Sequence, residues 1–175
     1  MPNSQSSGWL EDLKRPFPEE DIEWRVARCG VKGDRPWCQV LAYVTSRAIQ
    51  NRLDEVCGPD GWQNEFRDIM AGGVMCGISI KCGEEWITKW DGSDKTQIEA
   101  TKGGLSGAMK RSGSQWGIGR YLYKLPQTWA ECVLSKSDYH SNRASYKKTG
   151  CYGSYGTIYW ATPMLPEWAV PARNV

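Results

Sequence analysis

The chain has 175 residues, of which 40% are hydrophobic and 24% are charged, as expected of one globular domain with a hydrophobic core. Every apolar run is far shorter than the ~18 residues of a membrane-spanning helix, and the polar, acidic N-terminus lacks the features of a signal peptide. We therefore expect a cytoplasmic protein.

The N-terminal part of the chain predicts an arm followed by two strands. Residues 1–15 are polar and then acidic, and we expect them to form a flexible arm. Residues 22–26 alternate apolar and polar side chains, and residues 37–44 form a largely apolar run, as strands do. Glycine, aspartate and proline between the two segments predict a turn.

A short helix is predicted over residues 45–58. Thr45 or Ser46 has the side chain of an N-cap residue, and Gly58 suits the end of a helix. Apolar residues recur between them at the spacing of one helix face, which is expected to pack on the core. These residues are Ile49, Leu53 and Val56.

An antiparallel meander is expected next. Residues 62–69, 74–82 and 85–90 have the composition of strands and are separated by turns that contain glycine. In the second segment, alternate residues from Val74 to Cys82 are apolar, which is the pattern of a half-buried strand.

The segment at residues 96–124 predicts a long helix, although it contains many glycines. Each glycine in a helix interior is destabilising by roughly 1 kcal/mol relative to alanine. Residues 95–124 contain six cations and one acid and carry a net charge of +5, whereas the rest of the chain carries −3. Because concentrated positive charge attracts polyanions, this segment is a candidate binding element.

A helical projection divides this segment into two faces. One face is expected to pack on the sheet and contains Leu105, Met109, Ser112 and Trp116. The opposite face combines small side chains with cations and contains Gly103, Gly107, Lys110 and Ser114, with Arg111 alongside. Either a phosphate chain approaches this second face closely, or the face is solvated and its glycines permit tight helix–sheet packing.

The order of the elements predicts an α+β fold, in which an antiparallel meander packs on one long helix and a shorter helix precedes the meander. We expect a core domain over residues 16–134. Residues 135–175 are expected to form a Ser/Tyr/Lys-rich loop and a C-terminal hairpin or tail, with an edge strand near residues 155–163.

Several kinds of chemistry are disfavoured by the sequence. The chain has one histidine and no Gly-x-x-x-x-Gly-Lys-Ser/Thr loop for nucleotide phosphates. Its seven cysteines match neither disulfide nor zinc spacings, so we expect reduced thiols and no metal site. The alternative is a metal site at Cys132, His140 and Cys151, which would need a fourth ligand from elsewhere in the chain. Acidic pairs at Glu84–Glu85 and Asp91–Asp94 leave open a magnesium-dependent nuclease.

Two stretches of sequence carry a family signature: AYVTSRAIQNRLDEVCGPDGW at 42–62 and QIEATKGGLSGAMKRSGSQWGIGRYLY at 97–123. Together they resemble the bacterial and phage branch of the Rad-fifty-two (Rad-twenty-two) family of single-strand annealing proteins. The resemblance extends from about residue 22 to about residue 125.

This resemblance implies a non-enzymatic protein that anneals complementary DNA strands in recombination and double-strand break repair, with neither ATP nor another cofactor. It implies rings or curved oligomers that hold single-stranded DNA in a basic groove with exposed bases, and that bind duplex DNA more weakly. Other implied partners are a single-strand-binding protein or a phage exonuclease. A membrane is not expected, and the place of action is the bacterial cytoplasm or nucleoid, or a phage-infected cell.

The resemblance also assigns residues to the DNA site. Lys110 and Arg111 match the family's Lys-Arg pair on the long helix, Arg25 matches an arginine on the first strand, and Arg47 matches a basic position at the start of the first helix. The full set expected to contact DNA is Arg25, Arg47, Lys95, Lys102, Gly107, Lys110, Arg111, Ser114 and Arg120. Independently of the resemblance, aromatic side chains can stack on unpaired bases, although most are expected in the core or in subunit contacts. The candidates near the basic segment are Tyr121, Tyr123, Tyr139, Tyr146, Tyr152 and Tyr155.

Two rival functions remain at this point. One is the metal-dependent nuclease, and the other is a basic structural oligomer that binds a protein partner. A nuclease would degrade labelled single strands in the presence of magnesium, whereas an annealing protein would accelerate duplex formation.

Overall fold

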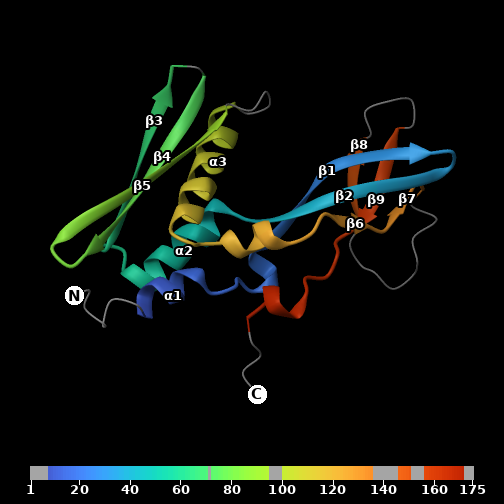
Figure 1. Ribbon diagram of the computed structural model, residues 1–175. Helices are drawn as coiled ribbons and strands as arrows, with labels where there is room; N and C mark the ends of the chain where they lie inside the picture. Colours follow the sequence, from blue (N-terminus) through green and yellow to red (C-terminus); the bar gives the residue numbers. More distant parts are fainter. Residues whose placement is uncertain (1–7, 71, 95–99, 136–145, 151–155, 172–175) are drawn as a thin grey trace.

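The computed structural model describes residues 8–70, 72–94, 100–135, 146–150 and 156–171 (Figure 1). The α-helices are α1 (Gly8–Lys14), α2 (Ser46–Cys57) and α3 (Ala100–Gln115), and the short 3-10 helices are η1 (Glu19–Asp21), η2 (Arg120–Lys124) and η4 (Glu167–Ala169). The strands are β1 (Ile22–Lys32), β2 (Arg35–Val44), β3 (Trp62–Ile69), β4 (Gly73–Cys82), β5 (Glu85–Asp94), β6 (Thr128–Ala130), β7 (Cys132–Val133), β8 (Tyr146–Gly150) and β9 (Thr157–Ala161).

These strands form three antiparallel sheets, with the orders β1-β2-β6, β3-β4-β5 and β7-β9-β8. α3 packs on the β3-β4-β5 meander, and the long β1–β2 hairpin extends away from that layer (Figure 1). The α+β prediction is therefore confirmed. Within the described ranges, no helix combines the length and apolar character needed to span a membrane.

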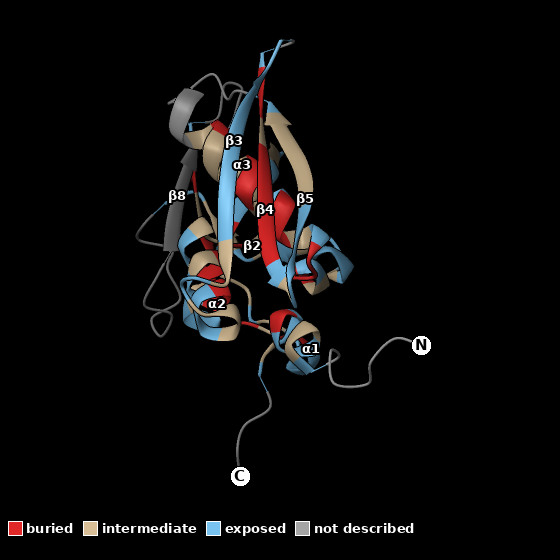
Figure 2. Cartoon of the chain, turned by 90° about the vertical axis from the view of Figure 1, so that its left-hand side faces the viewer, coloured by how far each residue is buried: buried red, intermediate tan, exposed pale blue. Residues whose placement is uncertain are grey.

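The sequence signals at α2 and β4 are also confirmed. The Thr45 hydroxyl accepts a hydrogen bond from the Ala48 N–H at 3.1 Å, and Gly58 ends α2 with a φ of 78°. Figure 2 shows β4 as a buried strand beside the exposed β3. The fully or almost fully buried side chains of β4 include Val74, Cys76, Ile78 and Ile80.

One face of α3 packs on the meander as predicted. Met109, Ser112 and Trp116 are buried. The Ser112 hydroxyl donates to the carbonyl of Lys89 on β5 at 2.9 Å, and the Trp116 Nε1–H donates to the carbonyl of Ile78 on β4 at 3.0 Å. These two hydrogen bonds fix how the helix lies across the sheet.

Two glycines of α3 allow close packing. A Cβ added at Gly107 would lie 2.6 Å from the Ser93 hydroxyl oxygen on β5, and one added at Gly113 would lie 3.2 Å from the Ile49 side chain on α2. The interpretation that Gly107 leaves space for a phosphate chain is therefore wrong, because Ser93 occupies that space. The alternative, tight packing of the helix, holds for both residues.

The helix ends at Gln115, and the chain then turns through Gly117, whose φ is 94°. The Arg120 guanidinium donates to the carbonyls of Ser114 and Gln115 at 2.5 and 2.7 Å. Lys89 Nζ also donates to the Gln115 carbonyl, at 3.1 Å. These cations satisfy the free carbonyls at the C-terminus of α3 and complement its dipole.

The N-terminal segment is folded from Gly8 onward, so the prediction of a flexible arm over residues 1–15 is wrong for residues 8–14. They form α1, and Leu13 is fully buried. Residues 1–7 lie outside the described ranges.

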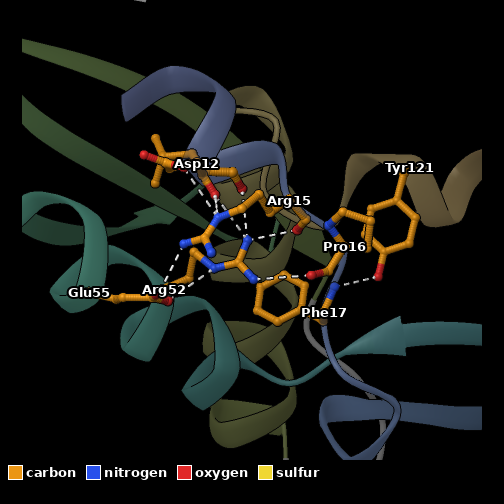
Figure 3. Close-up of polar contacts among 8 residues, drawn as sticks. Asp12, Arg15, Pro16, Phe17, Arg52, Glu55 and Tyr121 are labelled. Atoms are coloured by element: carbon orange, nitrogen blue, oxygen red, sulfur yellow. Dashed lines mark hydrogen bonds and ion pairs between the residues drawn. The ribbon is translucent and has the colours of Figure 1, made fainter. Parts of the chain in front are cut away.

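Arg52 of α2 holds this segment in place (Figure 3). Its buried guanidinium donates to the carbonyls of Arg15 and Pro16 at 2.7 and 3.3 Å and lies 4.1 Å from the centre of the Phe17 ring. The Phe17 N–H in turn donates to the Tyr121 hydroxyl at 2.9 Å. We refer to these five residues as the Arg52 cluster.

A second, smaller core lies on one face of the β1–β2 hairpin. Trp160 of β9 packs there against Trp24, Cys38 and Val40. Because β9 lies between β7 and β8, the prediction of an edge strand near residues 155–163 is wrong. The strand is central because both of its edges are paired.

Candidate nucleic-acid interface

Lys110 lies where α3 faces the base of the β1–β2 hairpin. Its Nζ is 4.5 Å from the centre of the Tyr43 ring on β2. The Tyr43 hydroxyl donates to a carboxylate oxygen of Glu23 on β1 at 2.6 Å. Lys110 and Tyr43 both line two adjoining hollows in the surface, which we call the Arg25 hollow and the Arg47 hollow.

The Arg25 hollow combines cations with apolar walls in a volume of about 220 Å³. Leu41 and Tyr123 line it beside Arg25, and these two side chains are 37% and 72% exposed. Arg25 is exposed and forms no ion pair with any described residue. The hollow can therefore present a positive charge next to an apolar surface.

The Arg47 hollow is polar and has a volume of about 260 Å³. Its charged and hydroxyl-bearing side chains include Arg47, Lys110, Ser46, Ser106 and Glu23. Arg47 stands in the first turn of α2, where the helix dipole disfavours a cation, and it is exposed without an ion pair to any described residue. Its position favours binding of an anion over a role in folding.

The charges around Lys110 are unbalanced. Burial lowers the pKa of Lys110, the nearby Arg25 lowers it further, and Glu23 offsets part of this effect. Burial and the hydrogen bond to Glu23 raise the pKa of Tyr43 to about 12, so Tyr43 is neutral at physiological pH. With Arg47, three cations face one carboxylate, and a bound anion would relieve the repulsion between Lys110 and Arg25.

Arg111 lies on a different side of α3 and contacts β5. Its Nε donates to one oxygen of Asp91 at 3.0 Å, and Gln115 donates to the other oxygen, also at 3.0 Å. Burial alone would raise the pKa of Asp91, but the hydrogen bonds from Gln115 and Arg111 lower it. The predicted Lys-Arg pair therefore separates, and Asp91 already balances the charge of Arg111.

Two of the other predicted DNA contacts, Arg120 and Gly107, make contacts elsewhere in the fold. Arg120 binds the carbonyl of Ser114 at the end of α3, and Gly107 packs on β5. Lys95 lies outside the described residues, and Lys102 lies in α3 with a side chain that is not described.

The tyrosines predicted to stack on bases also differ in position. Tyr123 is exposed, whereas Tyr121 belongs to the Arg52 cluster. The side chains of Tyr139, Tyr146, Tyr152 and Tyr155 are outside the described ones. Sequence reasoning missed Tyr43 and Glu23, although strand alternation places Glu23 on the same face as Arg25 and could have indicated it.

The acids and thiols considered for metal chemistry are partly described. They contain no cluster of three or more His, Cys, Asp or Glu residues that could hold a metal ion. Asp91, one acid of the nuclease hypothesis, is bonded to Arg111 and Gln115. The described cysteines form no disulfide bonds with one another, and they are Cys29, Cys38, Cys57, Cys76, Cys82 and Cys132.

Comparisons with known proteins identify the family of this chain. The chain is 34% identical over 161 residues to the single-stranded DNA-binding protein DdrA of Deinococcus radiodurans, and 29% identical over 161 residues to the protein of the same name in Deinococcus deserti. These matches cover 91% of this chain and 66% and 68% of the relatives, so the chain spans about two thirds of their length. Residues 6–141 match the family described as Rad52/22 family double-strand break repair protein. The chain thus belongs to the Rad52/22 family.

Proposed function

We propose that this protein binds single-stranded DNA and anneals complementary strands in recombination and double-strand break repair. The observation that carries the proposal is the convergence of Arg25, Arg47 and Lys110 on two adjoining hollows at the base of the hairpin. The family match and the relatives' name, single-stranded DNA-binding protein, support it.

Neutralisation of phosphates is the proposed source of affinity. Guanidinium, ammonium and hydroxyl groups suit phosphate oxygens, so binding should tolerate any base sequence. Each neutralised phosphate of a single strand contributes about −0.7 to the slope of log K against log salt. Bound strands repel each other less, and pairing then needs no covalent chemistry, which supports annealing without ATP by a protein that is not an enzyme.

We also propose that the protein acts as an oligomer, with a closed ring as one arrangement. β3 and β5 are the edge strands of the described meander, and unpaired edges are sites of strand addition. Exposed apolar side chains lie along these two strands: Phe66, Ile69, Trp86 and Ile87. A second copy that covered them would pair the edges, and repetition of this contact would close a ring.

An annealing assay with labelled complementary strands, without nucleotide, tests the function. The parent should accelerate duplex formation, and Lys110→Ala combined with Arg25→Ala should remove most of that acceleration. The control is Lys81→Ala, because Lys81 is exposed on β4 and does not line either hollow. Equal annealing by the double variant and the parent would refute the site.

The same assay with magnesium separates the rivals. Degradation of the strands would favour a nuclease. Unchanged strands with no acceleration of pairing would favour a structural oligomer, and the mass of the protein in solution would test the oligomer itself. A monomer at all concentrations would refute the ring.

A further inference from the structure

The β1-β2-β6 sheet has a second face, opposite the Trp160 core, that continues away from Lys110. Directly paired residues of antiparallel strands present their side chains on the same face of a sheet. From the Arg25 hollow to the tip of the hairpin, the rows on this face are Arg25–Leu41, Arg28–Gln39–Trp129, Gly30–Trp37 and Lys32–Arg35.

A β-bulge places these residues together. The register shifts between Val26 and Arg28, so Ala27 is an extra residue without a partner on β2. If Ala27 occupied a regular strand position instead, alternation would turn Arg28 to the face opposite Arg25. With it, the cations share one face, while the apolar residues Val26 and Val40 share the other.

Two tryptophans lie between these cations. The rings of Trp37 and Trp129 are 5.9 Å apart and meet edge to face, and Trp129 is 61% exposed. Gly30 accommodates Trp37, because an added Cβ at Gly30 would lie 2.6 Å from the indole. An indole left largely in water gains little burial energy from folding, so its position favours a ligand.

The charge of this face identifies the kind of ligand. Arg28, Lys32 and Arg35 are exposed and form no ion pair with any described residue. A strand rises about 3.3 Å per residue, so the step from Arg25 to Lys32 spans on the order of 20 Å. Cations on both sides of accessible aromatic rings suit unpaired nucleic acid, because the cations contact phosphates and the rings stack on bases.

We propose that this face, the tryptophan track, extends the path of a single strand from Lys110 to the tip of the β1–β2 hairpin. Arg28, Lys32 and Arg35 hold phosphates, and Trp37 and Trp129 stack on unpaired bases. The proposal rests on the proposed function, and it adds two tryptophans that line neither the Arg25 hollow nor the Arg47 hollow.

The test compares two single strands of equal length, an oligothymidylate and an abasic strand with the same phosphates. Trp129→Ala should weaken binding of the oligothymidylate about 10-fold, because one base stack is lost. Binding of the abasic strand should not change, and Trp129→Phe should retain most of the affinity. Trp168→Ala is the matched control, because Trp168 is 52% exposed and lies in η4, which is not part of the β1-β2-β6 sheet.

The outcomes separate this proposal from the proposed function. If Lys110→Ala weakens binding and Trp129→Ala does not, the track is refuted and the function stands. If neither variant matters, the site assignment behind the function fails as well. A loss that is equal for both strands, or a change in oligomeric mass caused by Trp129→Ala, would overturn base stacking and make the face a structural or subunit contact.

Discussion

Arg52 and Lys110 are both cations next to an aromatic ring, but they differ in the groups that face their positive charge. The Arg52 guanidinium lies on Phe17 and donates to backbone carbonyls of the N-terminal segment (Figure 3). The Lys110 ammonium lies on Tyr43 and has Arg25, a like charge, as a neighbour. The chain itself supplies hydrogen-bond acceptors for Arg52. At Lys110, a bound anion would offset the repulsion from Arg25.

The pKa shifts show the same difference. Burial lowers the pKa of both side chains. At Arg52 the larger charge effect is the opposing one of Glu55, and Arg15 lowers the pKa less. At Lys110 the larger charge effect is the further lowering by Arg25, and Glu23 raises the pKa less. A cation removed from water stabilises the fold when hydrogen-bond acceptors surround it. A cation with too few acceptors is available to bind an anion. The predictions below test whether this division into folding and binding cations holds.

The largest effect is expected from Arg52→Ala. The substitution removes the hydrogen-bond donor of several buried or partly buried carbonyls. Each buried carbonyl left without a donor costs about 1–3 kcal/mol of folding stability. We expect the free energy of unfolding in urea to fall by about 3 kcal/mol. DNA affinity of the molecules that remain folded should stay unchanged, and Arg52→Lys should recover part of the stability. A stable Arg52→Ala protein with weakened DNA binding would reverse the assignment.

The double substitution of Arg25 and Lys110 by alanine should weaken DNA binding and leave stability almost unchanged, the reverse of Arg52→Ala. Loss of two phosphate contacts should weaken binding of single-stranded DNA about 30-fold or more at low salt. The free energy of unfolding should change by less than about 1 kcal/mol, since the substitution also removes a like-charge repulsion. Fluorescence anisotropy and urea unfolding on the same preparations measure both, and a large loss of stability would contradict the account.

A smaller effect concerns pH. Because the pKa of Lys110 lies below that of an ordinary lysine, Lys110 loses its proton earlier as pH rises, and phosphate binding then weakens. Between about pH 7.5 and about pH 9.5, the parent should lose several-fold more affinity than Lys110→Arg, which stays charged. Lys81→Arg is the control and should follow the parent. Identical pH profiles for the parent and Lys110→Arg would show that Lys110 does not bind phosphate as a cation.

The smallest expected effect is at Arg111. Asp91 already balances this charge, so Arg111→Ala should weaken DNA binding no more than about 3-fold. Asp91→Asn should strengthen it by a similar factor, because it frees the guanidinium and removes a negative charge. A loss as large as that of Lys110→Ala would place Arg111 in direct contact with the strand.

Local signals in the sequence predicted much of this fold correctly. Thr45 caps α2 because an N-cap depends on a contact only three residues away. The alternation along β4 and the buried face of α3 follow from simple periodicity, which neighbouring elements do not change. This reasoning indicated Lys110 from the basic face of the long helix, whereas Arg25 and Arg47 were connected with it only through the family resemblance.

Contacts between distant segments could not be predicted in this way. Residues 8–14 resemble an arm in the sequence, and their order depends on Arg52, which is far along the chain. Arg111 and Arg120 look equivalent to Lys110 until Asp91 and the carbonyls at the end of α3 are placed next to them. The bulge at Ala27 has no sequence signal, yet it decides which face carries Arg28.

The salt dependence of single-strand binding tests the central claim most directly. We predict that the slope of log K against log salt becomes shallower by about 1.4 when Arg25 and Lys110 are both replaced by alanine, because each phosphate contact contributes about 0.7. Lys81→Ala should leave the slope of the parent unchanged. A slope that is the same for the double variant and the parent would contradict the assignment of these residues to the phosphate-binding site.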